Sequence, residues 1–419
     1  MFVVVVQLAG GVSSGDYLES AIPTYALAHG HVACMFPAVT GLPWAIAPIY
    51  PIISGSIVAV GHLGATVPFP AGTHHGCATV IHAFARSVNL LRPDHTLQDI
   101  AWLGWVVLAG GVAAFLVTTD RVRTRWELLT AGVLAVSPPV FECLTSYLHP
   151  EGLVAVGLVF GALACLRRGI WFTAGVLCAL AVLTHQSAML AVLAVIVVAP
   201  SARLVRLLGG LLITTVIVMV PLAIVTSGRA ITSLSGRGFS LPGNDTWIGY
   251  WNPSGSTMWL VSRVLPFVAV AVIALVTRRR LGPDVLAAHR LVALVTVSFA
   301  MRLAFEGVLY DYYFMAVAVC LVVLDVARGR VRAMTILWLV LVTIAFDPLV
   351  GRANPAQFVA WLPDQQIVLV GLALWLGLRS LWGPDTAITD SRVDLPSDSS
   401  RSSSLPVPPA SAPATRVRR

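Results

Sequence analysis

The chain has 419 residues, of which 57% are hydrophobic and only 11% are charged, and its mean hydropathy is +0.85. Soluble domains are closer to one quarter charged, so the composition excludes an ordinary soluble protein and indicates a polytopic membrane protein. The formal net charge of +8 comes from basic residues that are all arginine. Because they lie between apolar runs, they indicate membrane topology rather than a nucleic-acid partner.

Apolar runs recur along the chain, many of them close to the length that crosses about 30 Å of hydrocarbon. The first, 1–12, is short for a span. The later runs predict membrane helices over 100–118, 128–147, 152–166, 170–184, 187–200, 207–226, 258–276, 290–309, 311–327, 333–350 and 366–382. Some of these are short, so we expect them to tilt or to pair as hairpins. The fold class predicted is an all-α polytopic transmembrane bundle of about 11–13 spans.

The segment 41–66 is broken by Pro43, Pro48 and Pro51. Counting crossings from the N-terminus places Arg121 on the wrong side unless this segment is re-entrant or passes twice. In that case Cys34 and Cys77 both face the oxidising side, where disulfides persist. A disulfide between them and a pair of free buried thiols remain equal alternatives. The six cysteines show no CxxC spacing, which disfavours a structural zinc site.

Arginine clusters set the expected topology, because short loops rich in arginine stay cytoplasmic. The clusters are Arg121, Arg123 and Arg125; Arg167 and Arg168; Arg203 and Arg206; Arg278 to Arg280; and Arg328, Arg330 and Arg332. From Arg121 onward, all of them fall on one side. The last segment, 383–419, is rich in Ser, Pro and Arg, and it predicts a disordered cytoplasmic tail after a membrane domain over 1–382.

The opposite side collects polar residues that hydrocarbon tolerates poorly, and such groups usually face a cavity and mark function. They are Asp16, Tyr17 and Glu19; His149 and Glu151; His185 and Gln186; Asn244, Asp245, Trp247, Tyr250, Trp251 and Asn252; Arg302 and Glu306; and Asp311, Tyr312 and Tyr313. These residues come from well-separated segments. We expect them to meet in one polar cavity that opens to the extracytoplasmic side.

Each motif also has a purely structural interpretation. His149-Pro150-Glu151 is a normal helix start, with proline in the first turn and a carboxylate near the positive end of the dipole. Asp16 is able to cap a helix, and His185 to occupy a turn. Arg302 and Glu306 have the spacing of an ion pair on one helix face. The aromatic residues suit an interfacial belt. These interpretations weaken together, because a scaffold does not need five segments with polar groups on one side.

The order of these motifs resembles the polytopic GT-C glycosyltransferases, specifically bacterial glycosyltransferase family 87. The resemblance covers roughly residues 1–350. It rests on SGDYLESA, ALAHGHVACMFP with PIYPIISG, YLHPEGLVAVGL, LCALAVLTHQSAMLA and RLAFEGVLYDYYFMAVAV. Tyr50-Pro51-Ile52 stands at a Tyr-Pro-Pro position of the family, and His185 stands where lysine or glutamine is common.

The resemblance implies a GT-C-like fold in a bacterial inner membrane and transfer of a sugar, of mannose or arabinose type, from a polyprenyl-phosphate donor to an extracytoplasmic glycan or glycolipid. Asp16 is then the general base of an inverting displacement. The donor phosphate is bound by His149, Glu151, His185, Gln186, Arg302, Glu306 and Asp311. Trp247, Tyr250 and Trp251 stack on sugar or anchor their loop. Neither a metal nor another cofactor is expected, and the partners are lipids and lipid-linked sugars.

Two other classes stay open. A transporter or flippase predicts inverted repeats and polar residues in the middle of broken helices; no repeat is evident, and the polar residues lie at span ends. A catalytically inactive membrane assembly protein predicts that substitution of Asp16 has no effect.

Overall fold

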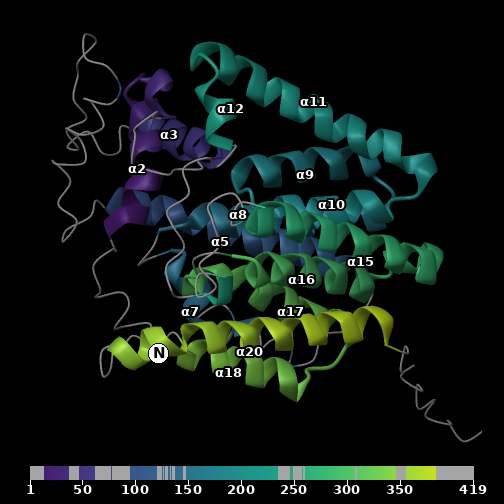
Figure 1. Cartoon of the computed structure of the whole chain (residues 1–419). Helices are drawn as coiled ribbons and strands as arrows, with labels where there is room; N and C mark the ends of the chain where they lie inside the picture. The colour runs from purple at the N-terminus through teal and green to yellow at the C-terminus, as the bar shows by residue number, and fades with distance from the viewer. Residues whose placement is uncertain are drawn as a thin grey trace, which may run out of the picture. The chain divides into compact units, whose positions relative to one another are not determined.

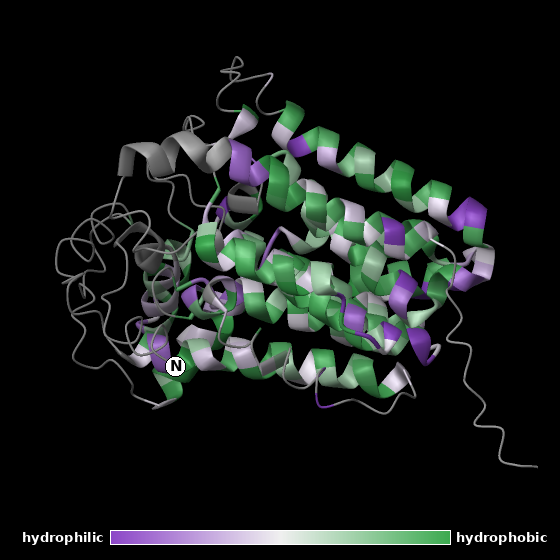
Figure 2. Ribbon diagram, turned by 90° about the horizontal axis from the view of Figure 1, so that it is seen from below, coloured by the Kyte–Doolittle hydropathy of each residue, from purple (hydrophilic) through white to green (hydrophobic). Residues whose placement is uncertain are grey.

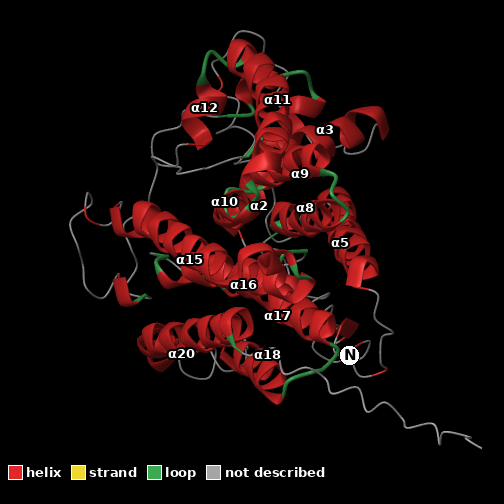
Figure 3. Ribbon diagram, turned by 90° about the vertical axis from the view of Figure 1, so that its right-hand side faces the viewer, coloured by secondary structure: helices red, strands yellow, loops and turns green. Residues whose placement is uncertain are grey.

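The computed structural model describes residues 14–36, 47–61, 77, 95–119, 125, 127, 131–132, 134, 137–144, 148–234, 246–248, 257, 260–306, 309–345 and 355–383. Within these ranges every regular element is a helix and none is a strand (Figure 3). For these residues the prediction of an all-α fold is confirmed, and the number of membrane spans stays a prediction. The predicted disordered tail lies outside the described residues from 384 onward, so it stays a prediction.

The elements follow one another with short connections wherever the structure describes both neighbours (Figure 1). The α-helices are α2 (Ser14–Ala28), α3 (Ile49–Gly61), α5 (His95–Leu116), α7 (Pro138–Glu142), α8 (Pro150–Arg167), α9 (Trp171–Thr184), α10 (Ala188–Val198), α11 (Ser201–Val225), α12 (Arg229–Leu234), α15 (Leu265–Leu281), α16 (Ala288–Ala304), α17 (Met315–Arg328), α18 (Ala333–Ala345) and α20 (Pro355–Trp382). The short 3-10 elements are η1 (Val32–Cys34), η2 (Val117–Thr119), η4 (Gly282–Leu286) and η5 (Asp311–Phe314), and η3 (Leu260–Val264) is a π-helical turn.

Five helical segments in the described part of the chain are long and apolar enough to cross a membrane: Thr96–Thr119, Pro150–Arg167, Ser201–Val225, Leu260–Leu286 and Asp364–Trp382. Four further apolar helices, α3, α9, α10 and α18, are shorter. Hydrophobic residues cover the lengths of the helices, and many of the hydrophilic ones gather at helix ends (Figure 2). The chain is therefore a helical membrane protein by length and composition.

Glycines let pairs of helices approach closely. A Cβ added to Gly111 of α5 would lie 2.0 Å from the carbonyl oxygen of Gly157 in α8, and one added to Gly175 of α9 would lie 2.0 Å from the carbonyl oxygen of Leu207 in α11. Small residues at such crossings are typical of membrane helices, whose association depends on close van der Waals packing. The first crossing packs α5 against α8, the second packs α9 against α11, and α8 also contacts α9.

Arginine side chains join helix ends at one end of the bundle. Arg167 at the end of α8 donates to the carbonyl oxygens of Thr118 (2.9 Å) and Leu286 (3.2 Å). Arg278 of α15 donates to the carbonyl oxygen of Val197 at the end of α10 (2.9 Å). Carbonyls at helix C-termini lack partners within their own helix and carry partial negative charge, so arginine satisfies and stabilises them.

A buried ion pair fastens the turn between α17 and α18 at the same end. Asp325 has 1% of its side chain exposed and contacts Nε of Arg332 at 2.5 Å. Arg332 also donates to the hydroxyl of Ser380 in α20 (2.8 Å), and its backbone N–H donates to the second oxygen of Asp325 (2.8 Å). One carboxylate therefore connects three helices through a single arginine.

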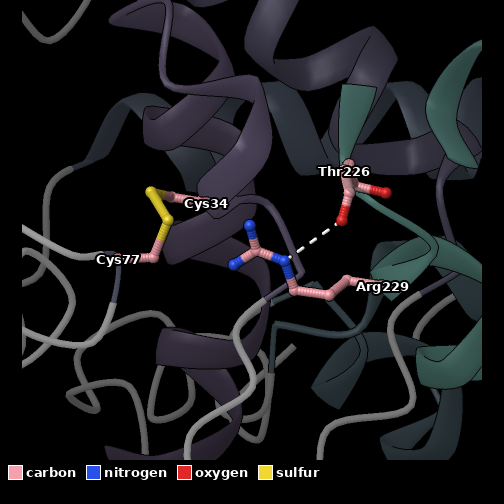
Figure 4. Close-up of a disulfide and its surroundings, with 4 residues drawn as sticks. All are labelled: Cys34, Cys77, Thr226 and Arg229. Atoms are coloured by element: carbon pink, nitrogen blue, oxygen red, sulfur yellow. Dashed lines mark hydrogen bonds between the residues drawn. A yellow bond between two sulfur atoms is a disulfide. The ribbon is translucent and has the colours of Figure 1, made fainter. Parts of the chain in front are cut away.

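Cys34 in η1 forms a disulfide with Cys77, with 5.2 Å between the Cα atoms. Of the two alternatives left open by the sequence, the disulfide is the one that the structure contains. Arg229 at the start of α12 extends toward it and donates from Nε to the carbonyl oxygen of Thr226 (Figure 4). The loop after α2 is thus covalently tied to a segment 43 residues further along the chain.

Three boundaries differ from the sequence predictions. Within 128–147 the described residues 131, 132 and 134 are helical, and the short helix α7 starts anew after Ser137, because Pro138 and Pro139 suit the first turn of a helix and not its interior. Helix α16 ends at Ala304, so Glu306 is not on the same helix as Arg302. Within 41–66, the described helix α3 has 13 residues, which is about 20 Å and too short to cross a bilayer alone.

Candidate functional site

Six separate parts of the chain bring ionisable and aromatic side chains together at the other end of the bundle. They are the start of α8, the turn between α9 and α10, the end of α16, and η5, together with Tyr50 of α3 and Arg263 of η3, which interact electrostatically with this group. We call the residues His149, Glu151, His185, Arg302, Glu306, Tyr312 and Tyr313 the polar cluster.

His149 and Glu151 form the first pair of the cluster. Nδ1 of His149 lies 2.5 Å from Oε1 of Glu151, and the two side chains are only 8% and 16% exposed. His149 precedes Pro150, the first residue of α8, and Gly104 of α5 leaves room for Pro150, because a Cβ there would lie 2.8 Å from its carbonyl oxygen. The second oxygen of the carboxylate, Oε2, is buried and has no hydrogen-bond partner within the described part of the chain.

The backbone before His149 is unusual. Leu148 has φ +52°, a left-handed value that costs a residue with a Cβ about 1–3 kcal/mol. The hydroxyl of Ser20 in α2 donates to the carbonyl oxygen of Leu148 (3.1 Å), which helps to hold this conformation. Such strained positions concentrate at functional sites, so the geometry favours more than a simple helix start.

Arg302 and Glu306 form the second pair, with 3.2 Å between Nε and Oε2. The guanidinium of Arg302 also lies over the ring of Tyr313, 5.1 Å from its centroid, which is a cation–π arrangement. The ion pair that the sequence predicted is therefore present although Glu306 lies beyond the helix end. Its side chains are 18% and 9% exposed, so solvent screens this charge pair less than a surface pair.

Tyrosines connect the two pairs. The ring of Tyr312 stacks on His149, with centroids 4.4 Å apart, and meets Tyr313 edge-on at 4.6 Å. Tyr310 stacks on Tyr312 at 5.7 Å and is 39% exposed. The two consecutive tyrosines of η5 thus bridge from the imidazole of His149 to the guanidinium of Arg302, and they do not form an outward-facing interfacial belt.

His185 lies in the turn between α9 and α10, as the sequence predicted. Its Nδ1 lies 2.5 Å from the hydroxyl of Ser187 and accepts the backbone N–H of Ser187 at 3.3 Å. Burial lowers the pKa of His185 well below its usual value, and the charges of Arg302 and His149 lower it further. His185 is therefore neutral at pH 7 and lies within electrostatic range of both pairs.

Trp247 anchors its loop against the end of α16. Its indole N–H donates to the carbonyl oxygen of Ala304 (2.6 Å), and its backbone N–H donates to the side-chain oxygen of Gln366 in α20 (3.2 Å). Gln366 in turn donates to the carbonyl oxygen of Leu303 (2.7 Å). Of the two roles open to Trp247 in the sequence, anchoring is observed here, and stacking on a sugar stays a prediction.

Several predicted site residues lie partly or wholly outside the described residues. Asp16 belongs to α2, one helical turn before Ser20, and Asp311 opens η5, but the side chains of both lie outside the described set. Tyr250 and Trp251 fall there entirely. Gln186 occupies the turn beside His185 and is half-buried.

Two residues escaped the sequence analysis. Arg263 lies in the π-helical turn η3, within electrostatic range of Glu306, Arg302 and Tyr313. Tyr50 of α3 is buried and lies within range of Glu151. Arg263 is a single arginine at the start of an apolar run, and its local sequence does not indicate that it reaches the polar cluster. An isolated arginine away from the loop clusters could still have marked it as a candidate functional residue.

In the described part of the chain, no group of three or more His, Cys, Asp or Glu side chains is arranged to hold a metal ion. No protein-family model, no curated protein and no solved structure matches the chain.

Proposed function

We propose that this protein is a membrane glycosyltransferase that moves a sugar of mannose or arabinose type from a polyprenyl-phosphate donor to a glycan or glycolipid. The supporting observation is the convergence of the polar cluster at one end of an apolar bundle, with the Arg302–Glu306 pair inside it. A lipid-linked sugar phosphate needs hydrocarbon for its tail, cations for its phosphate and polar groups for its sugar. The polar cluster supplies the cation and the polar groups, and the apolar helices beside it supply the hydrocarbon surface.

The donor phosphate is assigned to Arg302. A guanidinium presents a planar fork of N–H donors that suits two phosphate oxygens, and it stays charged at any physiological pH. Glu306 fixes its orientation through the 3.2 Å contact. His185 adds a neutral N–H donor, and His149 with Glu151 borders the same group. Gln186 and Asp311 stand next to these residues in sequence and remain proposed contributors.

The resemblance places the general base at Asp16. In that scheme the Asp16 carboxylate takes the proton of the acceptor hydroxyl as its oxygen attacks the anomeric carbon, and the bond from that carbon to the phosphate oxygen breaks. One displacement inverts the anomeric centre. Trp247, Tyr250 and Trp251 are proposed to border the sugar.

The proposed arrangement is a GT-C-like bundle of about 11–13 spans in a bacterial inner membrane, with the polar cluster outside and the arginine end and tail in the cytoplasm. The disulfide supports this orientation, because disulfides persist in oxidising compartments. The orientation can be tested in a variant whose four free cysteines are replaced by alanine. A cysteine introduced at Tyr310 should react with an impermeant maleimide from outside, and one at Arg168 should not. The opposite labelling pattern would reverse the orientation.

The reaction itself is tested with purified protein in lipid nanodiscs. We expect polyprenyl-phosphate mannose or arabinose, supplied with a mixture of bacterial glycolipids, to yield free polyprenyl phosphate and a glycolipid one sugar heavier by mass spectrometry. Asp16→Asn should abolish both products while the protein stays folded. Full turnover by that variant would refute the base assignment. Movement of an intact donor across vesicles without cleavage would instead favour a flippase.

A further inference from the structure

The hydrogen-bond partners of the two histidines in the polar cluster indicate that the rings carry their hydrogens on different nitrogens. Nδ1 of His185 accepts the backbone N–H of Ser187 at 3.3 Å, and a nitrogen that accepts a hydrogen bond has no hydrogen of its own. The hydrogen of the neutral ring is therefore on Nε2. His185 acts only as an N–H donor toward the rest of the cluster.

His149 has the opposite arrangement. An ionised carboxylate only accepts hydrogen bonds, so the 2.5 Å contact between Nδ1 and Oε1 of Glu151 places the hydrogen on Nδ1. The remaining nitrogen, Nε2, then carries the lone pair in the neutral ring. A carboxylate that holds an imidazole in this tautomer is the arrangement that prepares histidine to accept a proton.

The surroundings of His149 fix its ring. Tyr312 stacks on one face at 4.4 Å, the side chain is buried, and the preceding residue has the left-handed conformation that Ser20 helps to hold. The charged and titratable groups around it come from the neighbouring elements: Glu151 from α8, His185 from the α9–α10 turn and Tyr312 from η5. Arg302 of α16 acts on His185, and Tyr50 of α3 lies within range of Glu151. Helix α2, which contacts Leu148 through Ser20, carries Asp16 one turn earlier.

We propose that Nε2 of His149, positioned by Glu151, is the final acceptor of the proton released in the transfer. This inference rests on the proposed function. The acceptor oxygen forms its bond to the anomeric carbon, the bond between that carbon and the phosphate oxygen breaks, and its electron pair stays on the phosphate. The hydroxyl proton passes through Asp16 to Nε2, because an imidazole is ordinarily more basic than a carboxylate. The resulting imidazolium is paired with Glu151 and loses its proton to water after product release.

The tautomers can be measured without any substrate. Full-length protein labelled with ¹⁵N-histidine in nanodiscs is compared with His149→Gln, His185→Gln and, as a control at the opposite end, His289→Gln, so that each signal is assigned by its loss. At neutral pH we expect His149 to be protonated at Nδ1 and His185 at Nε2. Glu151→Gln should alter the His149 signal and leave that of His185 in place. The same tautomer on both rings, or a His149 signal that ignores Glu151→Gln, would overturn the proposal.

The catalytic role is tested by the dependence of transfer on pH. Wild-type turnover should fall on the acid side, where Nε2 is already protonated, and His149→Gln should reduce kcat by about 100-fold or more and remove that limb. Glu151→Gln should lower kcat and move the limb, and Glu151→Asp should restore part of the rate. His185→Gln should keep the limb. A wild-type kcat and pH profile in His149→Gln would refute the role of His149.

The two proposals fail in different ways. Expected histidine spectra without any sugar transfer by the wild-type chain would overturn the proposed function, and with it the catalytic role, while the tautomer assignment would stand. Sugar transfer with the wrong spectra would leave the function intact and overturn the assignment of His149.

Discussion

The two ends of the bundle use arginine in different ways. At one end, Arg167 and Arg278 donate to carbonyl oxygens at the ends of neighbouring helices, and Arg332 is neutralised by a buried aspartate. At the other end, Arg302 lies between Glu306 and the ring of Tyr313, next to two histidines. The first set completes the backbone hydrogen bonding of helices. Arg302 instead interacts with the side chains of Glu306 and Tyr313, and these contacts do not satisfy backbone carbonyls at a helix end.

This difference separates two roles of arginine in an apolar chain, one structural and one functional. Clustered arginines in short loops follow from topology and from the negative ends of helices. A single arginine outside those loop clusters, surrounded by ionisable residues from other helices, is more informative about function. If the comparison is right, substitutions at the two ends should separate stability from activity.

The largest effect is expected from Arg302→Gln. Removing a charged donor from a developing phosphate anion typically reduces turnover by about 100- to 1000-fold. Release of polyprenyl phosphate from a polyprenyl-phosphate sugar measures it. The matched control, Arg278→Gln at the arginine end, should change the rate by no more than about twofold. Equal losses in the two variants would remove the functional distinction between the ends.

The next effect concerns stability at the arginine end. Asp325→Ala leaves the charge of Arg332 buried without its carboxylate, and breaking such a pair costs about 3–5 kcal/mol of unfolding free energy. Asp284→Ala is a matched control, because its carboxylate is 79% exposed and lies 3.8 Å from Arg290, so its removal should cost at most about 1 kcal/mol. Thermal unfolding in detergent compares them. A similar Tm for the two variants would contradict the ion-pair interpretation.

Packing between the ends is tested at neighbouring glycines of α5. Gly111→Val adds a Cβ that would lie 2.0 Å from the carbonyl oxygen of Gly157, with two methyl groups beyond it. Such overpacking lowers the unfolding free energy by about 1–3 kcal/mol or more. Gly110→Val meets no atom within 4 Å and should leave the Tm close to that of the wild type. Because α8 carries His149 at its start, Gly111→Val should also reduce sugar transfer. Identical Tm values for Gly111→Val and Gly110→Val would show that the close contact between α5 and α8 does not contribute to stability.

The smallest effect is a pH dependence of stability. The folded state lowers the pKa of His185 from 6.5, so the unfolded chain binds its proton more readily. The stabilisation is therefore complete above about pH 6.5 and is lost as the pH falls from there toward the lowered pKa, by at most about 1.4 kcal/mol per pH unit. His185→Gln should flatten this part of the Tm profile. A profile in His185→Gln as steep as in the wild type would exclude this origin.

The sequence by itself determined the fold class and most helix positions. Apolar runs of membrane length, separated by arginine clusters, predicted both ends of α8, α9 and α10 to within two residues, because burial in hydrocarbon demands continuous apolar helices. The predicted starts of α11 and α15 differ from the observed ones by six and seven residues. It also singled out His149, Glu151, His185, Arg302 and Glu306, because charged groups in such runs are too costly to occur without a reason.

Only the tertiary structure decided how those residues meet. Side chains of Tyr312 and Tyr313 connect His149 to Arg302 across roughly 150 residues of sequence. No local pattern encodes this contact, since it depends on how α8, α16 and α17 pack against one another. The same holds for the tautomers of the two histidines: the hydrogen-bond partners of each ring are local in sequence, but only the folded backbone brings them within hydrogen-bonding distance.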